Sequence, residues 1–189
     1  SLNNITRASE LIRSFKQVAV EQSAEHLHSF NLYQLIDDSV KTVSPKLKKK
    51  LVTASIAGNN QLELTSYPGA ISQIIINLAM NSLTHGFTEQ TNDSISSKAG
   101  EINIHYQDAN NDMVAIVYKD NGKGINAENA HKIFEPFYTT NRHNGNTGLG
   151  MHIVYNLVTQ KLGGTITLKA TTIGVEFELI LPKLITFKE

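Results

Sequence analysis

The sequence contains no cysteine, no excess of charge of either sign and no long apolar run, and each absence narrows what the chain can be. Without cysteine there is no disulfide framework and no thiol chemistry, which fits a reducing compartment such as the cytoplasm. Lys and Arg number 17 and Asp and Glu number 17, so the zero net charge favours neither a nucleic-acid nor a membrane surface. No stretch approaches the ~18 consecutive apolar residues of a membrane span, and no signal-peptide pattern opens the chain.

What the sequence does contain is the composition of one folded domain. With 189 residues, 40% of them hydrophobic, the chain is long enough for one sizeable core with an appended element. Apolar side chains recur at spacings of three and four over residues 3–26, which predicts one helix with a bundle or coiled-coil contact. We therefore expect an appended helix over 1–28 and the main domain over 29–189. The lysine cluster at 46–50 is more typical of a solvated helix end or turn than of a binding patch.

Helix and strand patterns are interleaved along the main domain. Apolar periodicity predicts helices over 33–43 and 70–87, and a third helix after Gly150. Alternating residues predict strand pairs joined by tight turns, namely 51–58 with 61–67, 101–108 with 113–120, and 164–172 with 175–182. Pro68 and Gly69 are expected to end the first of these hairpins. Because hairpin strands are antiparallel, we expect an α+β fold: a two-layer sandwich of a mixed, mostly antiparallel sheet against helices, not a doubly wound parallel sheet.

One polar line runs along the otherwise apolar helix predicted at 70–87. Gln73, Asn77 and Asn81 follow one another at one-turn spacing, and Thr84 or His85 continues the line. A single buried asparagine would most simply bond a neighbouring loop, whereas a whole stripe favours a polar ligand along that face. The side-chain carbonyl of Asn81 is a suitable hard oxygen ligand for magnesium, an ion usually shared with substrate phosphates.

A glycine-rich stretch, "NRHNGNTGLG", leads into the third predicted helix. Unpaired backbone N–H groups at such a junction favour a phosphate, although neither GxxxxGK[ST] nor GxGxxG is present. Two other stretches, "DNGKGI" from Asp120 and "IFEPFYTT" from Ile133, need no function when taken alone. The first is ordinary turn chemistry, and the aromatic residues of the second could belong to the core.

The order of these pieces is more specific than any one of them. An Asn-x-x-x-Asn helix, a strand ending in DxGxG, Phe-x-x-Phe, a GLG loop entering a helix, and a final hairpin after Gly-Gly resemble the ATP-binding catalytic domain of sensor histidine kinases. That family belongs, with gyrase, Hsp90 and the MutL proteins, to a group with the Bergerat fold, and the resemblance covers roughly residues 30–183. The matched positions are Asn77 and Asn81 (N box), Asp120, Gly122 and Gly124 (first glycine box), Phe134 and Phe137 (F box), Gly148 and Gly150 (second glycine box), and Gly163 with Gly164 before the hairpin.

The resemblance implies a role for each matched residue. Asp120 would accept a hydrogen bond from the adenine amine, Gly122 and Gly124 would let the backbone approach base and sugar, and Asn81 would hold Mg²⁺. Residues 138–147 would form a lid with Arg142 near the phosphates. The expected ATP-binding residues are Asn77, Asn81, His85, Asp120, Gly122, Gly124, Ile125, Phe137, Thr139, Thr140, Arg142, Thr147, Gly148, Leu149 and Gly150. The chain departs from the family at Thr84 and His85, where a lysine or arginine is frequent, and at Asn141, where a lysine is frequent.

The same resemblance separates transfer from hydrolysis. Hydrolysing relatives carry a glutamate one turn before the magnesium asparagine, whereas this chain has Asn77, an amide that cannot accept a proton from water. We therefore expect a protein-histidine kinase with ATP and Mg²⁺ as cofactors and with Asn77 and Asn81 as its catalytic pair. A nucleotide-binding regulatory module and an ATP-hydrolysing relative stay open as alternatives.

The resemblance also implies partners. Residues 1–28 would be the end of the second helix of a dimerisation hairpin. The full-length protein would then be a homodimer. A response regulator is the expected partner, and no nucleic acid is expected. The phosphoacceptor histidine would lie on the first helix, so this chain alone is expected not to phosphorylate itself, since His26 and His28 lie at the far end of the second helix. We expect a cytoplasmic domain, while a parent protein in the inner membrane stays open.

Overall fold

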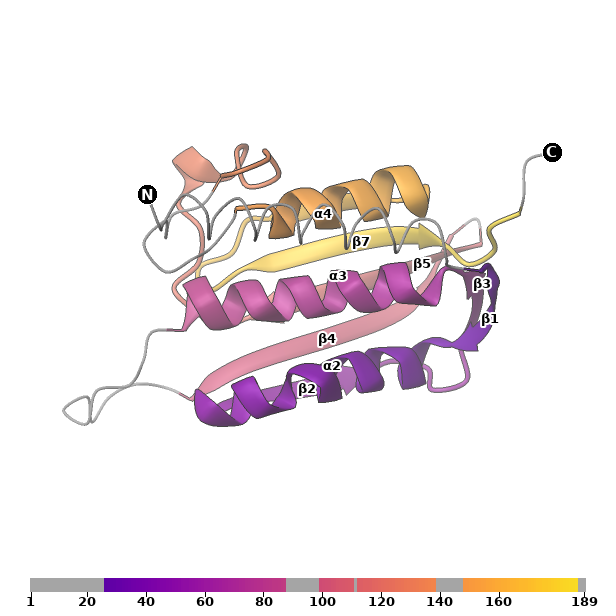
Figure 1. Cartoon of the computed structure of the whole chain (residues 1–189), viewed down its shortest axis with the longest axis horizontal. Coiled ribbons are helices and arrows are strands. Elements are labelled where there is room, and N and C mark those ends of the chain that lie inside the picture. Colours follow the sequence, from indigo (N-terminus) through magenta and orange to yellow (C-terminus); the bar gives the residue numbers. More distant parts are fainter. Residues whose placement is uncertain (1–25, 88–98, 111, 139–147, 187–189) are drawn as a thin grey trace, which may run out of the picture.

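A five-stranded sheet with helices packed on one face forms the body of the domain (Figure 1). The computed structural model describes residues 26–87, 99–110, 112–138 and 148–186. The sheet has the order β2-β4-β5-β7-β6, with bounds Val52–Ala57, Gly100–Ala109, Met113–Asp120, Glu176–Pro182 and Thr165–Lys169. The helices are α2 (Leu32–Lys49), α3 (Pro68–Asn81) and α4 (Gly150–Asn156). The predicted N-terminal helix lies outside the described residues.

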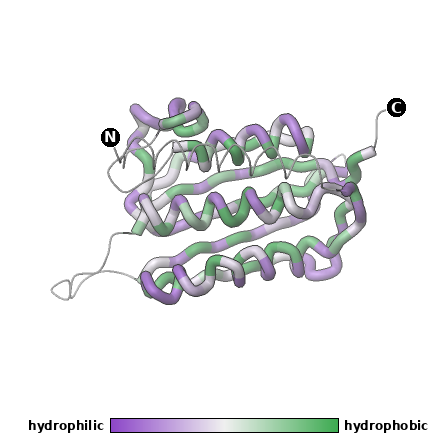
Figure 2. The backbone as a smooth tube through the Cα atoms, in the orientation of Figure 1, coloured by the Kyte–Doolittle hydropathy of each residue, from purple (hydrophilic) through white to green (hydrophobic). Residues whose placement is uncertain are grey.

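The directions of the strands confirm the mixed, mostly antiparallel sheet. β2 runs parallel to β4, whereas β4 with β5, β5 with β7 and β7 with β6 are antiparallel. The predicted hairpins β4–β5 and β6–β7 are both present. Buried Ile102, Ile104 and Tyr106 alternate along β4 with exposed residues, so one face of the sheet meets the helices. Figure 2 shows the same alternation of hydrophobic and hydrophilic residues along strands and helices.

The first predicted hairpin is wrong, because the two expected strands never pair with each other. β3 (Glu63–Ser66) pairs antiparallel with β1 (His28–Asn31) in a separate two-stranded sheet, with Phe30 opposite Leu64. β2 instead lies parallel to β4, which follows it by more than 40 residues in the chain. Both strands carry the expected alternation, but alternation does not name the partner strand.

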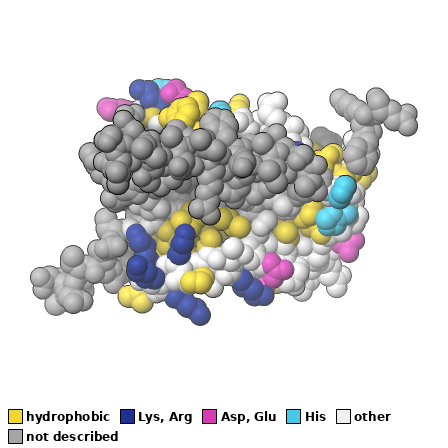
Figure 3. All heavy atoms as spheres, in the orientation of Figure 1, with side chains coloured by type: hydrophobic (Ala, Val, Ile, Leu, Met, Phe, Trp, Pro, Cys, Tyr) yellow, Lys and Arg dark blue, Asp and Glu magenta, His cyan; other side chains and the backbone are white. Residues whose placement is uncertain are grey.

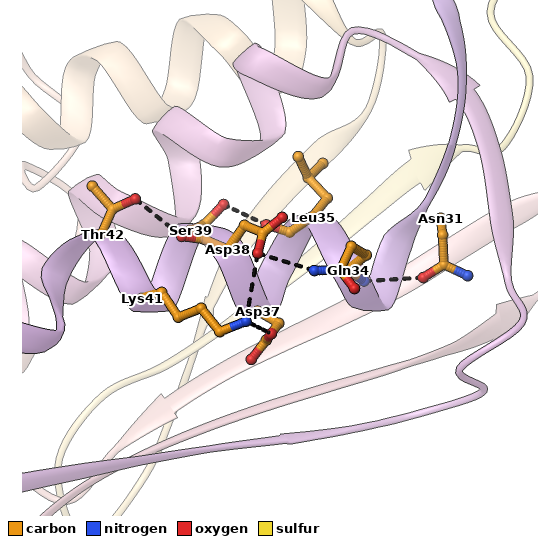
Figure 4. Close-up of polar contacts among 8 residues, drawn as sticks. All are labelled: Asn31, Gln34, Leu35, Asp37, Asp38, Ser39, Lys41 and Thr42. Atoms are coloured by element: carbon orange, nitrogen blue, oxygen red, sulfur yellow. Dashed lines mark hydrogen bonds and ion pairs between the residues drawn. The ribbon is translucent and has the colours of Figure 1, made fainter.

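Helix α2 is longer than predicted, since it continues through Pro45 to Lys49. Pro45 is exposed, and the buried stripe continues past it with Val43 and Leu47. The proline therefore lies on the solvent side, where a carbonyl that loses its backbone partner can bond water. Asn31 caps the start of the helix, because its side chain accepts a hydrogen bond from the Gln34 amide, and the outer face of α2 carries the ion pairs of Lys41 (Figure 4).

The lysine cluster divides into two parts. Lys46, Lys48 and Lys49 occupy the last turn of α2, as expected for a solvated helix end, and Figure 3 shows dark blue side chains gathered at this end of the molecule. Lys50 differs, because its Nζ donates to the carbonyl oxygens of Leu83 (2.6 Å) and Phe87 (2.9 Å). The end of α2 is thereby tied to the segment that follows α3.

Helix α3 starts at Pro68, which is therefore the first residue of a helix and not the end of a hairpin. After Asn81 the helix continues as a π-helical turn, Ser82–Gly86. α4 likewise continues as a π-helical turn over Leu157–Lys161, in agreement with the predicted helix after Gly150. Within the described ranges, no helix is long and apolar enough to cross a membrane.

Candidate functional site

The polar line predicted on α3 lies on one face of the helix and carries unpaired polar atoms. Gln73 Nε2 donates to Asn77 Oδ1 across 3.0 Å. The Nδ2 atoms of Asn77 and Asn81 and Nδ1 of His85 are buried and have no hydrogen-bond partner in the described part of the chain. Buried polar groups are almost always satisfied, so this row of three unpaired atoms marks a candidate site for a polar ligand.

The second glycine box meets this row at Asn81. A Cβ placed on Gly150, the first residue of α4, would lie 3.4 Å from Asn81 Oδ1 and 3.7 Å from its Nδ2. A glycine at position 150 therefore leaves the space in front of the Asn81 amide open. The structure thus brings together two motifs that are 69 positions apart in the chain.

Gly148 joins the glycine loop to the F box. Its φ is +68°, and a Cβ there would lie 2.6 Å from the carbonyl carbon of Phe137. Only glycine fits this left-handed position against the neighbouring backbone. Phe137 has 49% of its surface exposed, whereas Phe134 packs its ring against Tyr155 and Phe177. The two F-box aromatics therefore differ, because Phe134 belongs to the core and Phe137 borders the site.

Asp120 is the most deeply buried charged residue of the described chain, with 2% of its surface exposed at the end of β5. Its Oδ1 accepts hydrogen bonds from the backbone amides of Gly122 (2.9 Å) and Val175 (3.2 Å). Its Oδ2 accepts a hydrogen bond from the hydroxyl of Ser82, which lies directly after Asn81. Three donors therefore hold the carboxylate in one orientation.

The first glycine box packs against the end of the α3 segment. A Cβ on Gly122 would lie 2.8 Å from the Cα of Gly86, and the Lys123 amide donates to the Gly86 carbonyl across 3.1 Å. This close approach gives Gly122 a packing reason to be glycine. On the other side, Gly174 packs its backbone directly against Asp120, so the turn between β6 and β7 also closes on the carboxylate.

Charge and burial act on two titratable groups of this region. Burial lowers the pKa of His85, and the positive charge of Lys123 lowers it further. The imidazole is therefore held neutral to a lower pH than in water. Burial also raises the pKa of Tyr118 well above its ordinary value, so this hydroxyl keeps its proton.

Sequence reasoning missed several residues of the site. Ser82, Tyr118 and Val175 surround Asp120, and Lys50 ties down the segment from Leu83 to Phe87. The sequence could have predicted that Tyr118 lies near Asp120, since Tyr118 lies two positions before it on the same face of a strand. The amide of Val175 left no signal, because a backbone donor is independent of residue type.

Some predicted residues cannot be placed. Thr139, Thr140, Arg142, Thr147 and most of the lid lie outside the described residues. Ile125 follows Gly124 and is 37% exposed, whereas Leu149 is buried beside Gly150.

A magnesium ion would have to rely on few protein ligands here. Within the described ranges, no group of three or more His, Cys, Asp or Glu side chains could hold a metal ion. The Asn81 amide supplies one hard oxygen beside Gly150, and its Nδ2 has no hydrogen-bond partner among the described residues. This donor set fits Mg²⁺, which commonly takes only one or two protein ligands and fills its shell with phosphates and water.

The sheet order, the helices on one face and the residues at the ends of α3 and β5 define an ATP-binding domain of the Bergerat class. Residues 67–185 match the family model described as histidine kinase-, DNA gyrase B-, and HSP90-like ATPase. The match spans well over half of the chain, which therefore belongs to this family and binds ATP.

Individual relatives narrow the resemblance to sensor histidine kinases. Sensor histidine kinase ZraS of Salmonella typhimurium is 29% identical over 158 residues, which cover 82% of this chain and 31% of ZraS. Sensor kinase CckA of Brucella abortus is 28% identical over 191 residues, covering 98% of this chain and 20% of CckA. The chain thus spans a third or less of the length of these curated relatives.

Solved structures agree with this placement. The nucleotide-free catalytic domain of histidine kinase ThkA superposes with a TM-score of 0.71 at 27% identity, covering 84% of this chain and 97% of that one. ThkA in complex with the response regulator protein TrrA gives a TM-score of 0.68 at 25% identity, covering 96% and 50% of the two chains. The described domain is thus similar to a histidine kinase catalytic domain over nearly its whole length.

Proposed function

We propose that this domain binds Mg²⁺-ATP between α3, the end of β5 and the start of α4, and that it transfers the γ-phosphoryl group to a histidine. The row of unpaired buried atoms on Asn77, Asn81 and His85 carries the proposal, because a bound nucleotide would give these atoms partners. The acceptor histidine would lie on a dimerisation helix of the same protein, with relay to an aspartate of a response regulator.

The base end of the nucleotide would lie at Asp120. Oδ1 already accepts two backbone hydrogen bonds, whereas Oδ2 accepts one and keeps a further acceptor position. The exocyclic amine of adenine fits this position as a donor. Guanine has a carbonyl oxygen there, which would face the carboxylate as a second acceptor and leave both groups unpaired.

The phosphate end would lie at the asparagine row. Asn77 accepts from Gln73 through Oδ1, so its Nδ2 is free to donate to a phosphate oxygen. Asn81 would present its carbonyl oxygen to the magnesium ion beside Gly150. The ion, when bound, would neutralise phosphate charge and help orient the triphosphate. His85, Arg142 and the amides from Gly148 to Gly150 would add to phosphate binding.

Transfer is favoured over hydrolysis because Asn77, one turn before the magnesium-facing Asn81, cannot act as a base. The Asn77 oxygen is occupied by the Gln73 donor, and an amide cannot take a proton from water. Phosphoryl transfer then depends chiefly on positioning an acceptor in line with the γ-phosphate. Residues 1–28 would provide the end of the helix pair that carries this acceptor and forms a homodimer. The complex of ThkA with TrrA supports a response regulator as the next partner.

Radioactive phosphoryl transfer tests the proposal. The 189-residue chain and a longer chain carrying the preceding helix are incubated with γ-labelled ATP. We expect the short chain to bind ATP, to release phosphate slowly and to stay unlabelled, and the longer chain to gain an acid-labile label. Fast phosphate release that depends on Asn77 would instead place the domain among the hydrolases, and binding without transfer in the longer chain would make it a regulatory module.

A matched pair of variants separates the site from general folding. Asn81→Ala removes the magnesium-facing amide, whereas Asn103→Ala removes an amide on the exposed face of β4, whose Oδ1 accepts from Ser55. Only the first should abolish magnesium-dependent ATP binding in calorimetric titration. Equal losses in both variants would contradict the assignment of Asn81.

A further inference from the structure

A directed chain of hydrogen bonds ends on the base-recognising carboxylate. The Tyr118 and Ser82 hydroxyl oxygens lie 2.8 Å apart, and Ser82 Oγ also bonds Asp120 Oδ2. All three side chains are buried, with exposed fractions of 0% for Tyr118, 4% for Ser82 and 2% for Asp120. The three groups form one contiguous network beside the closely packed Gly86 and Gly122, and a Cβ on Gly86 would lie 3.6 Å from Asp120 Oδ2.

The number of protons fixes the direction of this chain. A carboxylate only accepts, so Ser82 must give its single proton to Asp120 Oδ2. The Ser82 oxygen can then only accept from Tyr118, whose hydroxyl keeps its proton because burial raises its pKa. Each hydrogen bond therefore runs toward Asp120, and bonds aligned in this way strengthen one another in a buried site.

We propose that Ser82 and Tyr118 are positioning residues for base selection, which hold the Asp120 carboxylate so that only one acceptor position on Oδ2 remains for an exocyclic amine. This inference deepens the proposed function and rests on it. Ser82 fills one lone pair of Oδ2 and fixes the plane of the carboxylate, while the amides of Gly122 and Val175 fill Oδ1. A single oriented acceptor in a desolvated site penalises any base that brings another acceptor.

The choice of variants follows from the direction of the chain. Ser82→Ala removes the donor on Oδ2 and leaves the Tyr118 hydroxyl buried without a partner. Tyr118→Phe removes the donor that orients Ser82. The double variant removes both hydroxyls, so it should regain stability relative to Ser82→Ala, since no buried donor is left unpaired. If the two hydroxyls had a purely structural role, the double variant would regain ligand selectivity together with stability. If they position Asp120, the double variant would regain stability but not selectivity.

Two matched controls remove buried hydroxyl groups elsewhere. Ser39 Oγ donates to the Leu35 carbonyl across 2.6 Å and lies 2.8 Å from the Ser72 hydroxyl oxygen on α3, and Ser39 is 2% exposed. Tyr106 OH donates to the Asn59 carbonyl across 2.9 Å, and Tyr106 is 1% exposed. Ser39→Ala and Tyr106→Phe therefore repeat the chemical changes away from Asp120.

The test measures Kd by calorimetry in the full 189-residue chain for ATP, for GTP and for purine riboside triphosphate, which lacks the 6-amine. In the wild type, loss of the amine should weaken binding about tenfold or more. The selectivity ratio is the Kd of the 6-amine-free nucleotide divided by the Kd of ATP. This ratio should fall toward one in Ser82→Ala and about threefold in Tyr118→Phe, and it should stay unchanged in both controls. The double variant should keep the low ratio of Ser82→Ala despite its recovered stability.

Two results would overturn the inference and are distinguishable. A wild-type chain that binds ATP and the 6-amine-free nucleotide equally would remove Asp120 from base recognition, and with it both the proposed pose and the inference. A wild type that prefers ATP, with folded variants that keep its full ratio, would leave the pose intact and refute the role of Ser82 and Tyr118. If Ser82→Ala does not fold, Tyr118→Phe and the double variant decide the question.

Discussion

The backbone amide of Val175 donates to Asp120 Oδ1 across 3.2 Å, although the two residues are 55 positions apart. The pairing of β5 with β7 creates this contact, because it sets Lys119 opposite Glu176 and brings the turn before β7 to the end of β5. The carboxylate is therefore held by the sheet itself as well as by the loop that follows it.

Replacement of Asp120 by Asn should weaken ATP binding by about 1.5–3 kcal/mol, the range for hydrogen bonds to charged groups. The amide can still accept from Gly122 and Val175 through one oxygen, but its NH2 group would then face both Ser82 and the adenine amine as a donor. Titration calorimetry with ATP and GTP measures the change. Asp108→Asn is the control, since Asp108 lies on the surface in an ion pair with Lys183. Equal ATP affinity in wild type and Asp120→Asn would refute the base contact.

Gly148→Ala should destabilise the domain and weaken ATP binding. A left-handed φ of +68° costs an L-residue about 1–2 kcal/mol, and the new Cβ would meet the carbonyl of Phe137. Gly163→Ala is the matched control, because Gly163 has φ +66° but nothing within 4 Å of its Cβ position. Urea unfolding gives the stability of each, and the excess loss in Gly148→Ala reports the contact with the F box. Identical losses of stability in the two variants would show that the contact between the new Cβ and Phe137 costs nothing beyond the left-handed φ.

The stability of the ligand-free domain should fall in acid in a manner that depends on His85. Burial first, and the charge of Lys123 second, lower the pKa of His85 below its unfolded value of about 6.5. The unfolded chain therefore binds the proton first. The contribution of neutral His85 to the free energy of unfolding is fully present above about pH 6.5. It is lost as the pH falls through the lower pKa of His85 in the folded state.

Urea unfolding of the wild type and of His85→Gln across this pH window tests the effect. The unfolding free energy of the variant should depend less steeply on pH from about 6.5 down to the lower pKa of His85 in the folded state. His105→Gln, on the exposed face of β4, serves as the control and should follow the wild type. A His85→Gln profile parallel to the wild type would contradict the assignment.

Lys50→Met should cost about 1.5–3 kcal/mol of stability, because Lys50 Nζ donates to the carbonyl oxygens of Leu83 and Phe87. The first of these carbonyls lies within the π-helical turn that carries His85 and the second directly after it, so ATP affinity should fall as well. Lys49→Met, in the exposed last turn of α2, should change neither quantity. Thermal unfolding and titration calorimetry measure both, and a Lys50→Met chain with wild-type affinity would separate this lysine from the site.

The sequence by itself determined the local features of this protein. The polar row from Gln73 to His85 was visible because a helix places every fourth residue on one face. The β4–β5 and β6–β7 hairpins followed from strand alternation around short turns, and the order of the glycine and asparagine motifs predicted the ATPase family, which the family match confirms. The polar row and the hairpins are signals within a few residues along the chain, where propensity and periodicity act directly, and each motif in the ordered series is itself a short local stretch.

Only the tertiary structure decided which distant segments meet. Alternation in β2 and β3 does not say that one pairs with β4 and the other with β1, because backbone hydrogen bonds are the same for every residue type. Pro45 interrupts a sequence pattern but not α2, since its position relative to solvent is set by how the helix packs. The network from Tyr118 through Ser82 to Asp120 likewise exists only after α3 has packed across the sheet, which places a hydroxyl from the helix beside a carboxylate from the strand.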